Sequence, residues 1–235
     1  MQRLQRFAIS GANRGIGLEF VRQLLARGDR VVAGCRHPGR ALKLTELAAA
    51  HSGHLHVVPL EVDKERSIAQ FAREAAMIAD SFDVLINAAG VLVSGERFGE
   101  LASKTFADTF HTNVIGPLLL AQAFAPVLAR GARARVVNIS SELGSLADTT
   151  GFHTPSYAVS KAALNMVTRL IAAELRPRDI AVISLHPGWV RTDMGGASAP
   201  LGATESVTGM LRVIDALESH DSGRFLDWRG ETLAW

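Results

Sequence analysis

Tyr157 and Lys161 are the two residues of this sequence whose types and spacing could do chemistry together. In a helix, positions four apart lie on the same face, so a phenol and an ammonium group can converge there. A nearby cation favours the phenolate and lowers the phenol pKa from its usual ~10, which would give a proton donor and acceptor usable near neutral pH. Tyr157 is also the only tyrosine in the chain. On its own the pair favours an ordinary surface contact, and only the rest of the chain reverses that interpretation.

A glycine-rich turn near the N-terminus has the setting of a dinucleotide-binding fingerprint. The apolar run 7–10 predicts a buried strand, and residues 18–25 have helical spacing. Between them, residues 11–17 read Gly-Ala-Asn-Arg-Gly-Ile-Gly, a different spacing from the commoner Gly-x-Gly-x-x-Gly. Glycines let the backbone approach a pyrophosphate at the positive end of the helix. A turn that binds no ligand is the alternative, and the flanking strand and helix argue against it.

The end of the second predicted strand, residues 30–35, bears on the choice of dinucleotide. In this class of fold an acidic residue there binds the ribose 2′-hydroxyl of NAD, whereas an arginine accommodates the 2′-phosphate of NADP. Here Cys35 and Arg36 occupy that place, and Arg14 can supply a second guanidinium group. The sequence therefore favours NADP(H). The alternative is that Arg36 is a solvated loop charge.

Strands and helices alternate along the chain, a pattern that predicts a parallel sheet with helices on both faces. The expected strands are residues 7–10, 30–35, 55–62, 83–86, 135–140, 180–185 and 224–228. The expected helices are residues 18–25, 42–50, 64–80, 100–130, 155–176 and 204–219. No linker, repeat or low-complexity segment interrupts the pattern. We expect residues 1–235 to form one α/β domain, a doubly wound Rossmann fold of about seven strands.

The long helix 100–130 contains a proline that should disturb it. Pro117 lacks a backbone N–H and should break or kink the hydrogen bonding there. Asn113 lies one turn before it and could bind a freed carbonyl group or a water molecule. A helix-capping or packing role is an equal alternative for this residue.

Composition limits the classes of function. A hydrophobic content of 48% and a charged content of 20% are typical of a soluble α/β protein. A net charge of +2 without a dense Lys/Arg run gives no support for nucleic-acid binding. No stretch approaches the ~20 apolar residues of a membrane span, and the first apolar run is too short for a signal peptide. With a single cysteine, Cys35, we expect a cytoplasmic protein without a membrane or nucleic-acid partner. The cluster of histidines at residues 51–56 lacks metal-ligand spacing, so no metal is expected.

The motifs together resemble the short-chain dehydrogenase/reductase family along nearly the whole chain. They are, in order, Gly11-x-x-x-Gly15-Ile16-Gly17, Asn87-Ala88-Ala89-Gly90, Asn113, Asn138-Ile139-Ser140-Ser141, Tyr157-x-x-x-Lys161 and Pro187-Gly188. Gly195-Gly196 and the ending 230–235 resemble its C-factor-like carbonyl reductase subgroup. Two features depart from the family pattern. Ala88 replaces a second asparagine expected to brace the sheet, and the stretch from Ser141 to Tyr157 is a few residues longer than usual, as it is in the subgroup.

The resemblance implies an NADPH-dependent oxidoreductase that interconverts a carbonyl and an alcohol. Tyr157 would be the general acid and base, and Ser141, in preference to Ser140, would hydrogen-bond to the substrate oxygen. Lys161 would hold the nicotinamide ribose and lower the Tyr157 pKa, and Asn113 would hold a water that links Lys161 to solvent. The cofactor-binding residues so implied are Gly11, Asn13, Arg14, Gly15, Ile16, Gly17, Arg36, Glu61, Val62, Asn87, Ala88, Gly90, Tyr157, Lys161, Pro187, Gly188, Val190 and Thr192.

The resemblance also implies a homodimer or homotetramer, because helices 100–130 and 155–176 pair across a two-fold axis in many relatives. The expected substrate is a small carbonyl or alcohol compound, which the loops 91–98 and 195–202 do not identify. Two alternatives of other classes remain. One is a dinucleotide-sensing regulator without turnover, which should lack the Tyr or the Lys. The other is a signalling protein, suggested by the C-factor likeness, although a shared fold is poor evidence for function.

Overall fold

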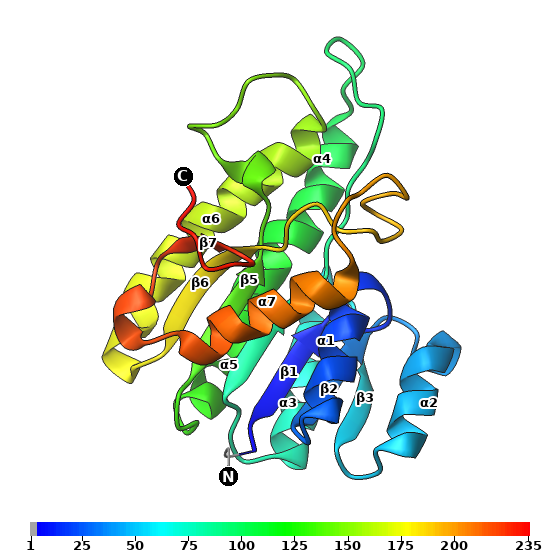
Figure 1. The fold of residues 1–235 in the computed structure, drawn as a ribbon, viewed down its shortest axis with the longest axis vertical. Coiled ribbons are helices and arrows are strands. Elements are labelled where there is room, and N and C mark those ends of the chain that lie inside the picture. Colours follow the sequence, from blue (N-terminus) through cyan, green and yellow to red (C-terminus); the bar gives the residue numbers. More distant parts are fainter. Residues whose placement is uncertain (1–3) are drawn as a thin grey trace.

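A parallel sheet of seven strands forms the centre of the computed structural model, which describes residues 4–235 (Figure 1). The strands are β1 (Arg6–Ser10), β2 (Arg30–Cys35), β3 (Leu55–Pro59), β4 (Val84–Asn87), β5 (Arg135–Ile139), β6 (Ala181–His186) and β7 (Phe225–Asp227). They lie in the order β3-β2-β1-β4-β5-β6-β7, and each neighbouring pair is parallel. The order reverses between β1 and β4, where open α/β sheets bind ligands. The predicted doubly wound Rossmann fold is confirmed.

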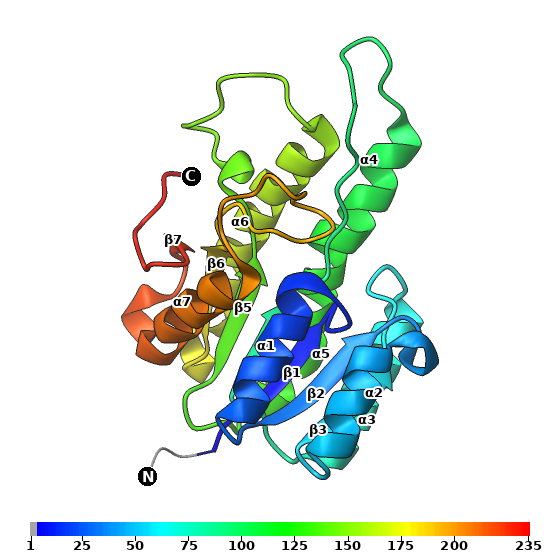
Figure 2. The same ribbon diagram turned by 45° about the vertical axis from the view of Figure 1, so that its right-hand side comes forward.

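Helices cover both faces of the sheet (Figures 1 and 2). One face carries α1 (Gly15–Ala26), α2 (Leu42–Ala50) and α7 (Ala203–Ala216). The other face carries α3 (Glu65–Ile78), α5 (Gly116–Leu128) and α6 (Pro155–Leu175). Successive residues of a strand point to opposite faces, so Phe7 and Ile9 enter the first hydrophobic cluster and Ala8 enters the second. This double burial explains why the strands read as continuous apolar runs.

The helix predicted over residues 100–130 is interrupted just before Pro117. The helix α4 (Ser103–Phe110) gives way to a π-helical segment, His111–Ile115, and α5 follows. Proline cannot donate to the preceding turn, and the wider π turn lies where that hydrogen bond is missing. Gly116 packs so closely that a Cβ atom there would lie 2.6 Å from the Val62 carbonyl oxygen. The break leaves Asn113 fully buried.

Strand β3 is shorter than the sequence predicted. Strand β3 ends at Pro59 and not at Val62, because the Glu61 N–H turns to the hydroxyl of Ser67, 2.9 Å away.

By length and composition the helical stretch Ser103–Leu128 could cross a membrane, but 56% of its most apolar window is buried inside the fold. Burial to this extent is typical of a helix in the core of a folded protein.

The aromatic centre of the second cluster should carry much of the stability. Phe124 is fully buried, and its ring lies 5.6 Å from that of Phe71 and 5.5 Å from that of Phe82. We expect Phe124→Ala to lower the free energy of unfolding by about 3–5 kcal/mol in urea denaturation, through lost burial and the cavity that remains. Met77→Ala is the control, because Met77 is 82% exposed. It should cost less than about 0.5 kcal/mol, and equal losses would contradict the assignment.

Candidate active site

A cavity of about 480 Å³ runs along the carboxyl ends of the strands. Most of the predicted site residues line it: Gly11, Asn13, Arg14, Gly15, Ile16, Gly17, Arg36, Val62, Ala88, Gly90, Ser141, Tyr157, Lys161, Pro187, Gly188, Val190 and Thr192. Glu61, Asn87 and Asn113 are not among the lining residues. The fold therefore collects motifs that are far apart in the sequence around one space.

Backbone, and not side chains, forms the floor of the cavity at the glycine turn. Gly11 and Gly15 have positive φ angles of 69° and 53°, which favour glycine. A Cβ atom on Gly11 would lie 2.7 Å from the Ala89 backbone, and one on Gly17 would lie 2.3 Å from the Gly11 carbonyl oxygen. The α1 helix begins at Gly15, so its first N–H groups have no intrahelical partners. This cradle has the shape and polarity that a pyrophosphate requires.

Two arginines line the cavity, and no acidic residue stands at the end of β2. Arg14 and Arg36 both line the cavity, and Arg14 pairs with Asp193 at 3.5 Å. Cys35 is buried, and burial raises the pKa of its thiol, so it is a neutral packing residue.

The Glu61 carboxylate, predicted to contact the cofactor, binds a neighbouring side chain instead. The Glu61 carboxylate pairs with Lys64 at 2.5 Å, and this hydrogen bond lowers the Glu61 pKa. Val62 and Asp63 line the cavity instead. Asp63 is thus a site candidate that sequence reasoning missed, although it lies in the same motif.

Two serines follow β5, and the structure gives them different surroundings. The Ser140 hydroxyl donates to Asn165 Oδ1 at 2.7 Å, and the residue is buried. Ser141 lies at the start of the short helical turn Glu142–Gly144 and accepts from the Leu143 N–H at 3.2 Å. The Ser141 hydroxyl also hydrogen-bonds to the Tyr157 phenol, which lowers the phenol pKa. The geometry favours Ser141 as the serine that can reach a substrate oxygen.

Burial dominates the ionisation of the Tyr157–Lys161 pair. Desolvation raises the pKa of Tyr157 to about 12, outweighing the Ser141 hydrogen bond, and lowers the pKa of Lys161 to about 8. The Lys161 ammonium donates to the Ile139 carbonyl at 2.8 Å and lies 5.4 Å from the centre of the Tyr157 ring. The expectation that Lys161 lowers the Tyr157 pKa is therefore wrong for this structure, because the dry surroundings penalise both charges.

Asn113 braces the cavity wall. Its Oδ1 accepts from the Val91 N–H at 2.9 Å, and its Nδ2 donates to the Val91 carbonyl at 2.9 Å and to Ser160 at 3.0 Å. The π-helical segment holds this side chain across from the Val91 backbone. The predicted role in holding a water beside Lys161 stays a prediction, since both polar atoms already bind protein.

Asn87 lies beneath the cavity in a buried polar chain. Its Nδ2 donates to Asn138 Oδ1 at 2.8 Å, and Asn138 Nδ2 donates to the Thr168 hydroxyl at 2.9 Å. Ser184 donates to the same hydroxyl at 2.9 Å, so the chain links β4, β5, β6 and α6. This network ties β4 to its neighbours where Ala88 replaces the expected asparagine. A direct contact of Asn87 with a cofactor ribose stays a prediction.

The remaining walls include residues that motif reading did not select. His186, at the end of β6, accepts from the Glu142 N–H at 3.2 Å, and burial lowers its pKa. Leu143, Trp189 and Met194 make this end of the cavity apolar. These residues follow the ends of strands, which was the one sequence feature that could have identified them, because their side chains match no motif. Among residues 4–235, no group of three or more His, Cys, Asp or Glu side chains could hold a metal ion.

Comparison with known proteins gives consistent matches. Residues 5–200 match the family model of short chain dehydrogenases. C-signal of Myxococcus xanthus is 47% identical over 153 residues, which are 65% of this chain and 92% of that protein. The NADPH-bound carbonyl reductase from chicken fatty liver is 40% identical, with a TM-score of 0.94 over 100% of both chains. The carbonyl reductase Sniffer of D. melanogaster is 32% identical, with a TM-score of 0.95 over 99% of this chain and 100% of that one.

The lone tyrosine makes its own ionisation measurable. Tyrosinate absorbance reports Tyr157 alone, because the chain has no other tyrosine. We expect the folded protein to stay protonated through about pH 10, where urea-unfolded protein is half ionised, because burial raises the folded pKa to about 12. This preference stabilises the fold fully below pH ~10 and is lost as pH rises through about 12. Half-ionisation of the folded protein at pH ~10 would contradict the burial argument.

Proposed function

We propose that this chain, which belongs to the short chain dehydrogenase family and to its carbonyl reductase-like subgroup, is an NADPH-dependent enzyme that interconverts a carbonyl and an alcohol. One observation carries the proposal. Tyr157, Ser141 and Lys161 line the same cavity as the glycine turn. A proton donor and a cradle for a dinucleotide therefore face one space.

The residues present fit the cofactor. The glycine turn and the start of α1 would hold the pyrophosphate, and Arg14 and Arg36 would bind the 2′-phosphate of NADPH. Lys161 would hold the nicotinamide ribose. When bound, the cofactor supplies the hydride, while the protein supplies position and protons.

Tyr157 is suited to protonate a carbonyl oxygen during reduction. With a pKa of about 12 its phenol keeps its proton at neutral pH. The Ser141 hydroxyl would donate a second hydrogen bond to the developing oxyanion. After the transfer, the Lys161 ammonium near the Tyr157 ring would offset part of the desolvation cost of the phenolate, and its pKa of about 8 leaves it mostly charged at pH 7. In the oxidation direction the phenolate accepts the alcohol proton.

The alternative is a sensing or signalling protein that uses the same fold without turnover. The likeness to C-signal supports it. The intact and converging Tyr157, Lys161 and Ser141 favour the enzyme, since a regulator needs no proton donor in the cavity. A small carbonyl or alcohol substrate and a cytoplasmic location belong to the same proposal.

Turnover with carbonyl compounds distinguishes the enzyme from the sensing or signalling protein. We expect purified protein to oxidise NADPH when quinones, diketones or aldehydes are added, as followed by the loss of NADPH absorbance. Tyr157→Phe keeps the ring and removes the proton, so kcat should fall about 10²–10⁴-fold while NADPH binding is retained. NADPH binding without turnover across the whole panel would reject the enzyme and favour the sensor.

Arg36 should determine the choice of cofactor. A charge-assisted hydrogen bond contributes about 1.5–3 kcal/mol, so Arg36→Asp should raise the KM for NADPH about 10–150-fold and spare or improve NADH. Arg40→Asp is the control, because Arg40 is an exposed arginine in the next turn that does not line the cavity. Equal kcat/KM for NADPH and NADH in the wild type would contradict the cofactor assignment.

We also propose that the protein is a homodimer or homotetramer assembled through α5 and α6. Val159, Met166 and Leu170 are exposed and lie along one stripe of α6, and Leu118 is exposed on the neighbouring α5. Apolar side chains in such a stripe gain free energy when a second copy covers them.

Light scattering tests this assembly. We expect the wild type at micromolar concentration to have at least twice the mass of one chain, and Met166→Glu to lower that mass, because a charge would be buried in the interface. Met77→Glu is the matched control, since Met77 is an exposed methionine on α3. A monomer mass for the wild type would reject the proposal.

A further inference from the structure

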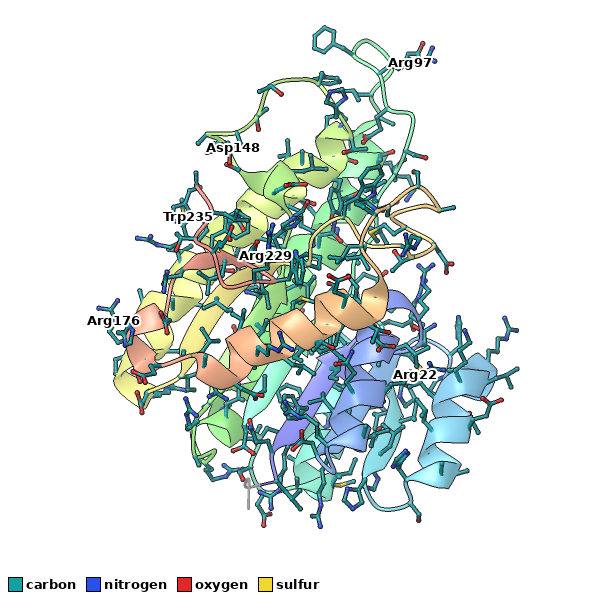
Figure 3. The ribbon with its side chains drawn as sticks, viewed as in Figure 1. Arg22, Arg97, Asp148, Arg176, Arg229 and Trp235 are labelled. Atoms are coloured by element: carbon teal, nitrogen blue, oxygen red, sulfur yellow. The ribbon has the colours of Figure 1, made fainter. Side chains whose placement is uncertain are left out.

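Two loops rise above the carboxyl edge of the sheet, at the top of Figure 1 (see also Figure 2). One spans residues 88–102 between β4 and α4, and the other spans residues 145–154 before α6. Figure 3 labels Arg97 on the first and Asp148 on the second. The second loop leads directly into the helical turn that carries Tyr157, so anything that holds this loop also bears on the active site.

The first loop contacts the second loop and the start of α6 through two separate interactions. Glu96 Oε2 accepts hydrogen bonds from the Ser156 N–H at 3.2 Å and from the Ser156 hydroxyl at 2.8 Å. Farther out, the rings of Phe98 and Phe152 meet edge to face with centroids 5.5 Å apart. A carboxylate and an aromatic pair thus join segments that are far apart in the sequence.

The first turn of α6 cannot cap itself. Thr154, the residue before it, has a left-handed φ of 39° and provides no side-chain cap. Pro155 has no N–H, so Ser156 is the first residue of the helix with a donor to satisfy. Glu96, 60 residues away, accepts that donor and places a negative charge at the positive end of the helix. The cap on this helix is therefore tertiary and not local.

Glu96 is half-buried, which sets it apart from an ordinary surface carboxylate. Ser156 is fully buried, and Glu96 Oε1 is buried without a hydrogen-bond partner among residues 4–235. Removing a carboxylate oxygen from water is costly, and its other oxygen offsets that cost only through Ser156. Glu96 is not among the residues that line the cavity, and its hydrogen bonds go to the first turn of α6. Its route to the reaction is therefore the helix.

We propose that Glu96 is a positioning residue: through Ser156 its carboxylate holds the first turn of α6, and that turn holds the Tyr157 phenol beside Ser141. The inference rests on the proposed function, in which Tyr157 is the proton donor. Tyr157 is the residue after Ser156, so a small rotation of this turn moves the phenol directly. Displacements of about 1 Å at a reacting group can cost 10²-fold in rate.

The test compares Glu96→Ala with Glu96→Gln. The alanine variant loses both hydrogen bonds, so its kcat should fall on the order of 10- to 100-fold, while the Kd for NADPH stays within about twofold, because the glycine turn is untouched. The glutamine variant keeps a carbonyl oxygen that can accept both bonds, so it should recover kcat to within about threefold. Glu100→Ala is the control: this exposed carboxylate of the same loop should leave kcat unchanged.

An optical titration gives a readout that does not depend on turnover. In Glu96→Ala the loosened turn should admit water to the phenol, so the Tyr157 pKa should fall from about 12 toward ~10. This shift tests the positioning role even if the wild type reduces none of the carbonyl compounds, which would reject only the proposed function. The inference is overturned if Glu96→Ala keeps both the wild-type kcat and the wild-type titration. It is also overturned if alanine and glutamine variants lose kcat, NADPH affinity and thermal stability in parallel, because that pattern is a general loss of structure.

Discussion

A buried row of polar bonds between α6 and β5 fixes the geometry on which the site depends. Lys161, Asn165 and Thr168 lie on one face of α6, and their partners are the Ile139 carbonyl, the Ser140 hydroxyl and the Asn138 amide. A slide of α6 by one turn would leave all of these groups buried without partners, at about 1–3 kcal/mol each. Apolar packing alone would tolerate such a slide far better. The polar row therefore sets the register of the helix, and the register sets the place of Tyr157.

The same burial determines how the site can work. Removal of water raises the phenol pKa and lowers the ammonium pKa, so the neutral phenol is the resting form of Tyr157. Buried, low-dielectric surroundings also strengthen any hydrogen bond to an oxygen that becomes negative during reaction. The fold supports many functions, and proteins similar to this chain carry names as different as C-signal and carbonyl reductase. The chemistry here is argued from the phenol, the serine and the ammonium group in their shared cavity.

Much of the fold and part of the site follow from the sequence alone, for local reasons. The glycines at 11, 15 and 17 are required by positive φ angles and by contacts that no side chain could share, so their spacing identified the turn. The alternation of apolar strands with helical segments predicted the sheet, because both faces of a parallel sheet must be covered. Pro117 marked the break in its helix because proline lacks an N–H. Each of these signals depends on neighbours in the chain.

Other properties depend on groups brought together across the sheet. Spacing placed Lys161 beside Tyr157, but the sign of the Tyr157 pKa shift was decided by the burial of both residues. Glu61 matched a cofactor motif, yet its carboxylate turns to Lys64, and Asn87 faces Asn138 beneath the cavity. Glu96 matches no motif, and only the packed structure brings it to Ser156. The sequence determined which backbone shapes and residue types were available, because those are local properties. The tertiary structure decided solvent access and polar partners, because desolvation and hydrogen bonding depend on everything that surrounds a group.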